Sequence, residues 1–166
     1  MKTTTASPTP SATDMEIRPL TEEHLSALFA LEKQCFSCPW SEKSFLGALR
    51  SPFTHGFGLF EEERLLGYAF LFALFEEGEV MNVAVAPEER GKGLSRILMD
   101  ALFKKAKEEQ VEILRLEVRQ SNLAARKLYE GYGFDYTGLR KGYYSAPKED
   151  ALLMEKAILQ QEHATK

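Results

Sequence analysis

The chain has 166 residues, of which 44% are hydrophobic, and this combination favours one domain with a substantial buried core. Its formal net charge of −4 argues against nucleic acid as the main partner, because phosphate backbones are bound by basic surfaces. No window of about 18 apolar residues exists, so we expect no membrane-spanning helix.

The composition of the two ends predicts where this domain begins and stops. Residues 1–14 consist mostly of Thr, Ser, Pro and Ala, which cannot bury enough apolar surface to fold. We therefore expect a disordered extension over 1–14, a single domain over 15–158 and a frayed polar tail over 159–166. Residue Met15 is an alternative start, and the sequence leaves open whether the extension is native.

Compartment and metal binding are predicted from the two cysteines, Cys35 and Cys38. A structural zinc site needs four ligands, and no second pair accompanies this C-x-x-C, so we expect no metal. The N-terminal residues contain no apolar segment typical of a secretory signal. Together these features favour the reducing cytoplasm, where both thiols stay free.

The first half of the domain alternates strand and helix signals. Residues 16–20 predict a strand, Thr21 a helix N-cap, and Ser41 the N-cap of a second short helix. Residues 56–60 and 65–75 predict two strands joined by a polar hairpin turn. The acidic residues of 76–79 then have two interpretations, a solvated loop or a site that attracts a cationic substrate.

The centre of the chain predicts a strand, a glycine-bearing loop and a helix in direct succession. Residues 79–86 are mostly apolar, which predicts a strand buried on both faces. After Pro87, the polar loop of residues 88–93 contains two glycines that can adopt positive φ. The following helix carries its apolar residues at helical spacing, namely Leu94, Ile97, Leu98, Ala101 and Leu102.

This strand, loop and helix order predicts an anion site, because the first N–H groups of a helix lack partners and lie at the positive end of its dipole. Arg90 and Lys92 add positive charge. A Walker A loop would need Ser or Thr after Lys92, and a dinucleotide fingerprint would need a glycine at Arg96, so both are disfavoured. An ordinary tight turn remains the alternative from the loop alone.

The second half of the domain predicts a strand over residues 112–119, with Glu117 on the face that also carries two arginines. Ser121 or Asn122 is expected to cap a helix that contains Tyr129 and ends at Gly133. Strands from Phe134 and over 150–158 follow, with a loop at 142–144 between them. The order predicts an α/β domain whose 79–86 and 112–119 strands are parallel around the crossover helix.

Two motifs at this spacing resemble those of the GNAT acetyltransferases. The loop from Arg90 to Ser95 resembles (Q/R)-x-x-G-x-(G/A), although Ser95 replaces the small Gly or Ala, and residues 122–134 resemble N-x-x-A-x-x-x-Y-x-x-x-G-F. The flanking residues 39–42, 116–122 and 143–144 are similar to the RimI group, which acetylates the N-terminal alanine of a ribosomal protein.

The resemblance implies a GNAT (acyl-CoA N-acyltransferase) fold with a central mixed β-sheet flanked by helices, and acetyl-CoA as co-substrate. It further implies that Glu117 is the general base and Tyr129 the general acid. The residues implied to bind the acetyl donor are Val83, Ala84, Val85, Arg90, Gly91, Lys92, Gly93, Leu94, Ser95 and Asn122.

Several interpretations stay open beside this one. Glu117 is also consistent with an ion pair to Arg115 or Arg119, and Tyr129 with aromatic core packing. The acceptor is expected to be a ribosomal-protein N-terminus or peptide, with lysine or a small amine as the alternative. A non-catalytic acyl-CoA-binding module would need only the loop, and the oligomeric state is not predicted.

Overall fold

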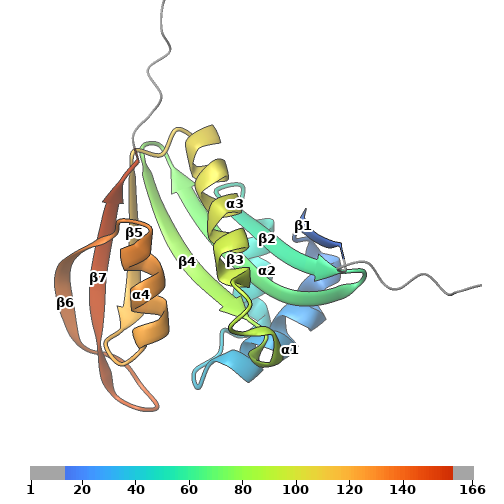
Figure 1. Cartoon of the computed structure of the whole chain (residues 1–166), viewed down its shortest axis with the longest axis horizontal. Coiled ribbons are helices and arrows are strands. Elements are labelled where there is room, and N and C mark those ends of the chain that lie inside the picture. The colour runs from blue at the N-terminus through green and yellow to red at the C-terminus, as the bar shows by residue number, and fades with distance from the viewer. Residues whose placement is uncertain (1–13, 159–166) are drawn as a thin grey trace, which may run out of the picture.

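A computed structural model describes residues 14–158 and shows a seven-stranded mixed sheet in the order β1-β2-β3-β4-β5-β7-β6 (Figure 1). All neighbouring strands are antiparallel except β4 and β5, which are parallel. The strands are β1 (Met15–Pro19), β2 (Thr54–Glu61), β3 (Arg64–Leu74), β4 (Glu77–Val85), β5 (Ile113–Arg119), β6 (Asp135–Tyr144) and β7 (Glu149–Ala157).

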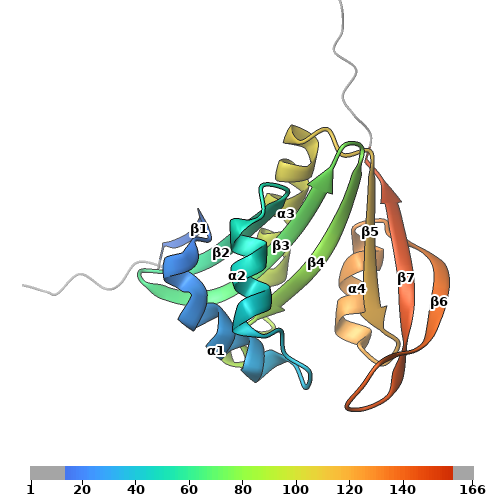
Figure 2. The ribbon, with the colours of Figure 1, turned by 180° about the vertical axis from the view of Figure 1, so that it is seen from behind.

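The helices divide between the two faces of the sheet. Helices α3 and α4 lie on one face, and α1 and α2 cover the β2–β4 part of the other (Figures 1 and 2). Each face has its own buried core, so the sheet is the common wall between two apolar layers. The helices are α1 (Leu25–Cys35), α2 (Glu42–Arg50), α3 (Leu94–Glu108) and α4 (Leu123–Gly131), with 3₁₀ turns at Glu22–His24 and Pro87–Glu89.

The element order and the fold class predicted from the sequence are confirmed. The predicted helix-capping residues are also found: Ser41 caps α2, Asn122 caps α4, and Gly133 has a φ of 88° just beyond α4. Within residues 14–158, no helix is long and apolar enough to cross a membrane. The predicted extension over 1–14, apart from Asp14, and the predicted tail over 159–166 lie outside the described residues.

The decisive feature of the sheet is that β4 and β5 separate soon after they meet. Their pairing covers three residue pairs, from Glu77 with Ile113 to Glu79 with Arg115. Beyond that point the two strands diverge in both views (Figures 1 and 2). The sheet therefore opens at its centre, and the residues of β4 and β5 beyond the pairing face a gap.

Four sequence predictions about local structure are wrong, and one of them follows from this gap. The predicted loop over residues 76–79 mostly belongs to β4, which begins at Glu77. Residues 81–83 of β4 are only half-buried, because β5 has moved away from them. Ile97, predicted for the core face of α3, is 39% exposed, and Met99 is buried instead. Residues 142–144, predicted as a loop, belong to β6 at an irregularity in its pairing with β7.

Candidate active site

Two adjoining cavities lie where β4 and β5 separate. The first, which we call the glycine-loop cavity, has a volume of about 450 Å³. It lies among the end of β4, the loop before α3, and α4. Of the sequence-predicted residues, the structure brings Val83, Ala84, Val85, Arg90, Gly91, Gly93, Leu94, Ser95, Asn122 and Tyr129 to its wall.

The glycine loop leaves the start of α3 accessible. Gly91 and Gly93 have φ values of 81° and 77°, and a Cβ atom at either would meet nothing within 4 Å. Gly93 is the N-cap of the 15-residue helix α3 and no side chain caps its first turn. Unpartnered N–H groups at the N-terminus of a long helix suit a phosphate-bearing ligand, so the loop fits the pyrophosphate group that the sequence predicted here.

Lys92 is the predicted loop residue that the structure does not bring to the cavity wall. Its ammonium nitrogen lies 2.7 Å from a carboxylate oxygen of Glu89, and Glu89 also binds Arg64 at 2.8 Å. The charge of Lys92 is therefore compensated within the protein, which leaves the backbone N–H groups and Arg90 as the candidate ligands for an anion here.

The second cavity, which we call the Glu117 cavity, has a volume of about 200 Å³. It shares five lining residues with the first, namely Phe36, Val83, Asn122, Ala125 and Tyr129. The two cavities therefore adjoin, and we call them together the cleft. The remaining lining of the Glu117 cavity comes from α1 and the segment after it, from β4, from β5 and from the end of β6: Glu32, Ser37, Cys38, Trp40, Val80, Met81, Asn82, Glu117, Val118, Arg119 and Tyr144.

Tyr129 lies at the junction of the two cavities. It is 8% exposed, and its ring makes an edge contact with Phe134 at 5.8 Å between centroids. Burial raises the pKa of Tyr129 well above its ordinary value, so the phenol holds its proton across the physiological range. Asn122 accepts a hydrogen bond from the Ala125 N–H at 3.2 Å, which fixes the start of α4 and thereby the position of Tyr129.

Glu117 projects from β5 into the Glu117 cavity. Arg115 and Arg119, the ion-pair partners that the sequence suggested, bind other carboxylates instead. Glu117 pairs with Arg140 at 3.4 Å, and its side chain is 22% exposed against 57% for Arg140. Such a half-exposed pair contributes little stability, ~1 kcal/mol or less, so it does not by itself account for a carboxylate at this position.

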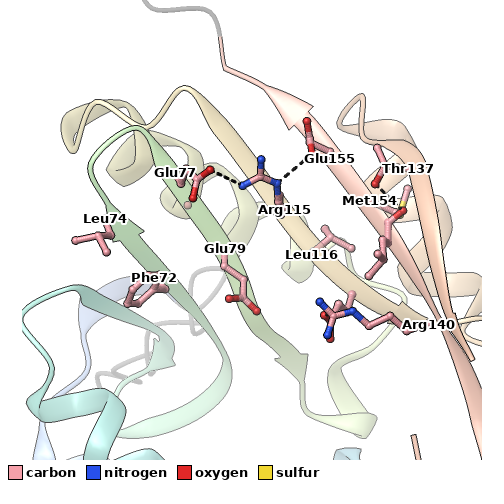
Figure 3. A pocket seen from close by; sticks show the side chains of 13 residues that line it. Phe72, Leu74, Glu77, Glu79, Arg115, Leu116, Thr137, Arg140, Met154 and Glu155 are labelled. Atoms are coloured by element: carbon pink, nitrogen blue, oxygen red, sulfur yellow. Dashed lines mark hydrogen bonds and ion pairs between the residues drawn. The ribbon is translucent and has the colours of Figure 1, made fainter. Parts of the chain in front are cut away.

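A third hollow, which we call the sheet groove, adjoins Glu117 on the part of the sheet that α1 and α2 leave uncovered (Figures 2 and 3). Arg115 bridges Glu77 and Glu155 across it, at 2.9 and 3.1 Å (Figure 3). Glu77 is therefore committed to an ion pair. Burial, followed by the charge of Glu117, raises the pKa of Glu79, the neighbouring carboxyl.

The chain matches the profile of the Acetyltransferase (GNAT) family over residues 25–134. It belongs to the GNAT acetyltransferase family. The [ribosomal protein bS18]-alanine N-acetyltransferase of Salmonella typhimurium is 34% identical over 137 residues, covering 81% of this chain and 92% of that relative. The Escherichia coli K12 protein with the same description is 33% identical over 132 residues, covering 78% and 88%.

Solved GNAT structures agree with these sequence relationships. The crystal structure of the Escherichia coli ribosomal-protein-S18-alanine N-acetyltransferase superimposes with a TM-score of 0.83 at 30% identity, covering 92% of this chain and 99% of that one. Arabidopsis thaliana NAA60 in complex with acetyl-CoA has a TM-score of 0.80 at 14% identity, covering 87% and 99%, and supports the fold alone.

As a GNAT acetyltransferase, the protein uses acetyl-CoA as its acetyl donor. We expect acetyl-CoA to raise the melting temperature of the wild-type protein, because a ligand at ~100 times its Kd stabilises by about 2.7 kcal/mol. Gly93→Asp should abolish this shift by placing a carboxylate at the open helix terminus, where a pyrophosphate would be repelled.

Gly93→Asn is the matched control for this thermal-shift experiment. Asn has nearly the same size as Asp and tolerates positive φ equally well, but it carries no charge. The Asn variant should therefore keep part of the shift that the Asp variant loses. An undiminished shift in Gly93→Asp would mean that the pyrophosphate binds elsewhere.

Sequence analysis did not identify Glu32, Trp40 and Tyr144, which also line the cleft. The signal for Glu32 was present: it follows Leu25 and Leu28 at helical spacing, so an acidic residue occupies a predicted core position of α1. Trp40 and Tyr144 lie outside the helices, and nothing in their local pattern predicts that they face one cavity.

Proposed function

We propose that this protein transfers the acetyl group of acetyl-CoA to the N-terminal alanine amine of a ribosomal protein, by direct attack within a ternary complex. The observation that carries the proposal is the pair of adjoining cavities, in which Tyr129 lines both and Glu117 lines the second. The relatives named as bS18-alanine N-acetyltransferases support this acceptor, and an acceptor of that kind supports a cytoplasmic location.

The donor side of the cleft is proposed to bind acetyl-CoA through the backbone of Val83–Val85, the loop from Arg90 to Ser95, and Asn122. Acetyl-CoA supplies a thioester whose carbonyl carbon accepts an amine. The unpaired stretch of β4 presents backbone N–H and C=O groups to the cleft, and an N–H group there can polarise a carbonyl oxygen. Holding both reactants in one cleft contributes up to roughly 7–11 kcal/mol in ideal intramolecular systems.

Glu117 is proposed to remove the proton that the acceptor must lose. An α-amino group has a pKa of about 8, so at neutral pH it is mostly an ammonium ion that cannot attack a carbonyl. The Glu117 carboxylate, which lines the Glu117 cavity, accepts that proton directly or through one water. Its pairing with Arg140 and the Tyr143 hydroxyl keeps the carboxylate oriented.

Tyr129 is proposed to act on the leaving sulfur. A thiolate resembling that of cysteine has a conjugate acid with a pKa of about 8.5, and a protonated phenol stabilises it. The raised pKa of Tyr129 keeps the phenol protonated but weakens it as an acid. Its contribution therefore begins as a hydrogen bond to the sulfur while negative charge develops. As the C–S bond breaks, the sulfur takes the phenol proton, and the second proton that the attacking nitrogen must lose restores the phenol, so Tyr129 ends protonated.

The test is to supply acetyl-CoA with a panel of acceptors and to locate the added acetyl group by mass spectrometry. The panel contains an alanine-first peptide with the bS18 N-terminal sequence, the same peptide with its α-amine blocked, a peptide with one internal lysine, and small amines. We expect acetylation of the α-amine of the alanine-first peptide and none of its blocked form.

Two results would contradict the proposal. Acetylation on the lysine side chain or on a small amine, with the alanine-first peptide unmodified, would favour the second enzymatic interpretation. Binding of acetyl-CoA without acetylation of any panel member would favour a regulatory acyl-CoA-binding module.

A further inference from the structure

Glu32 is a buried carboxylate that the proposed chemistry does not use. It lies in the last turn of α1 and is 1% exposed. A negative charge at the C-terminal end of a helix opposes the helix dipole, and burying it removes its hydration, so neither helix stability nor solvation explains a glutamate there. Its contacts with other elements must therefore compensate for both costs.

Three donors from three different elements converge on this carboxylate. Oε1 accepts the backbone N–H of Trp40 at 3.0 Å, and Oε2 accepts the side-chain amide of Asn82 at 2.9 Å and the hydroxyl of Tyr68. Burial raises the pKa of Glu32, while the bonds from Trp40 and Asn82 oppose that rise. A carboxylate can satisfy three donors at once, because it accepts at both oxygens and donates at neither.

Two of these donors form walls of the Glu117 cavity. Trp40 belongs to residues 36–41, which connect α1 to α2, whereas Asn82 lies on β4 where it has parted from β5. Glu32 thus joins the connecting segment to the central strand. Tyr68, the third donor, is fully buried on β3 and is absent from the cavity lining.

Other contacts also hold this segment, and the Cys35 thiol directly before it donates to the Val85 carbonyl of β4 at 3.5 Å. The Trp40 ring packs against Phe45 at 5.2 Å and Phe70 at 6.0 Å between centroids. At the other end of the segment, the Cys38 thiol donates to the Ser145 carbonyl at 3.0 Å, which links it to the turn between β6 and β7. Glu32 is the side chain that hydrogen-bonds both this segment, at Trp40, and β4, at Asn82.

We propose that Glu32 is a positioning residue that fixes Trp40 and Asn82 as facing walls of the Glu117 cavity and thereby sets the affinity for the acceptor. This inference rests on the proposed function in one respect, that the acceptor amine enters the Glu117 cavity. Glu32 itself also lines the Glu117 cavity, but none of Glu32, Trp40 and Asn82 lines the glycine-loop cavity, where the acetyl donor is proposed to bind.

The test is Glu32→Gln, assayed with whichever amine the wild-type protein acetylates in the panel. Glutamine has nearly the same shape, but its own N–H donors point at groups that also donate. The hydrogen bond from either Trp40 or Asn82 to this side chain is therefore lost. We expect the acceptor KM to rise roughly tenfold, and the acetyl-CoA KM to change by less than about twofold. Hydrogen exchange of the Trp40 amide should also become faster.

Tyr68→Phe is the matched control. It removes a donor from the same carboxylate and destabilises the same core, but Tyr68 does not itself line the cavity, and its direct contact with the Asn82 wall is one long hydrogen bond of 3.5 Å. We expect a lower melting temperature with little change in acceptor KM. If Tyr68→Phe raises the acceptor KM as much as Glu32→Gln does, the effect follows stability and the positioning role is wrong.

The double variant Glu32→Gln with Asn82→Asp exchanges the amide and the carboxylate between the two positions, so donors again face acceptors. It also tests the proposal if the single variant fails to fold. We expect its acceptor KM to return toward that of the wild type. A folded double variant with an acceptor KM still raised, or a single variant with both KM values raised alike, would overturn the proposal. Because every comparison uses the amine that the wild type acetylates, an error in the proposed acceptor would appear in the panel and not here.

Discussion

Tyr129→Phe is expected to lower kcat by roughly 10²–10⁴-fold while folding and acetyl-CoA binding survive. The substitution removes only the hydroxyl and keeps the ring that packs against Phe134. The loss follows from the position of Tyr129 at the junction of the two cavities. Among the described residues that line both cavities, Tyr129 carries the one hydroxyl group, so no other can replace it.

Steady-state kinetics and thermal-shift measurements together test this prediction. The wild-type increase in melting temperature with acetyl-CoA should be retained by the Phe variant, which shows that the donor still binds. Tyr132→Phe serves as a comparison, because Tyr132 lies at the C-terminal end of α4, the helix that carries Tyr129. Its hydroxyl hydrogen-bonds Asp100 at 2.8 Å, outside the cleft. A Tyr129→Phe enzyme with wild-type kcat and reduced stability would make Tyr129 a packing residue.

Glu117→Gln should lower kcat by a comparable factor, and its defect should depend on pH in a distinctive way. Raising the pH through about 8 converts bulk α-amine to its free base, so the reaction then needs the general base less. The Gln variant should therefore recover part of its activity at high pH. Tyr129→Phe should gain less, because its missing hydroxyl acts on the sulfur and not on the amine.

Arg140→Gln separates catalysis from ion pairing at Glu117. It breaks the 3.4 Å ion pair but leaves the carboxylate in place. If Glu117 is the base, Arg140→Gln should reduce kcat far less than Glu117→Gln does, over the whole pH profile. Equal losses in the two variants, without recovery at high pH, would assign Glu117 to the ion pair alone.

Much of the fold was predictable because its signals are local. Proline, glycine and capping residues mark most element boundaries, as Ser41 and Gly133 illustrate, and alternation along β5 identified Glu117 as lying opposite the core. The divergence of β4 from β5 was not predictable, because an apolar strand sequence does not specify how far its neighbour accompanies it. For the same reason residues 81–83 were wrongly assigned to a fully buried strand.

The candidate site was predictable where motif spacing carries information. Tyr129 and Asn122 lie on one helix, so their spacing fixes their relative position, and the structure places both on shared walls of the cleft. Lys92 was placed in the anion site because of its charge, but the sequence does not show that Glu89, three residues earlier, would compensate it. Glu32 was overlooked because its partners are far away in the chain.

The brief parallel pairing of β4 and β5 also has a consequence for how the molecule holds together. Strands β1–β4 and β5–β7 form two half-sheets whose direct hydrogen-bonded joint covers three residue pairs, with the rest of the connection made by the core beneath α3 and α4. A substrate lying between the parted strands bridges these half-sheets. With acetyl-CoA bound as proposed, we expect the two half-sheets to open together, so that amide hydrogens at the three paired residues exchange more slowly than in the free protein.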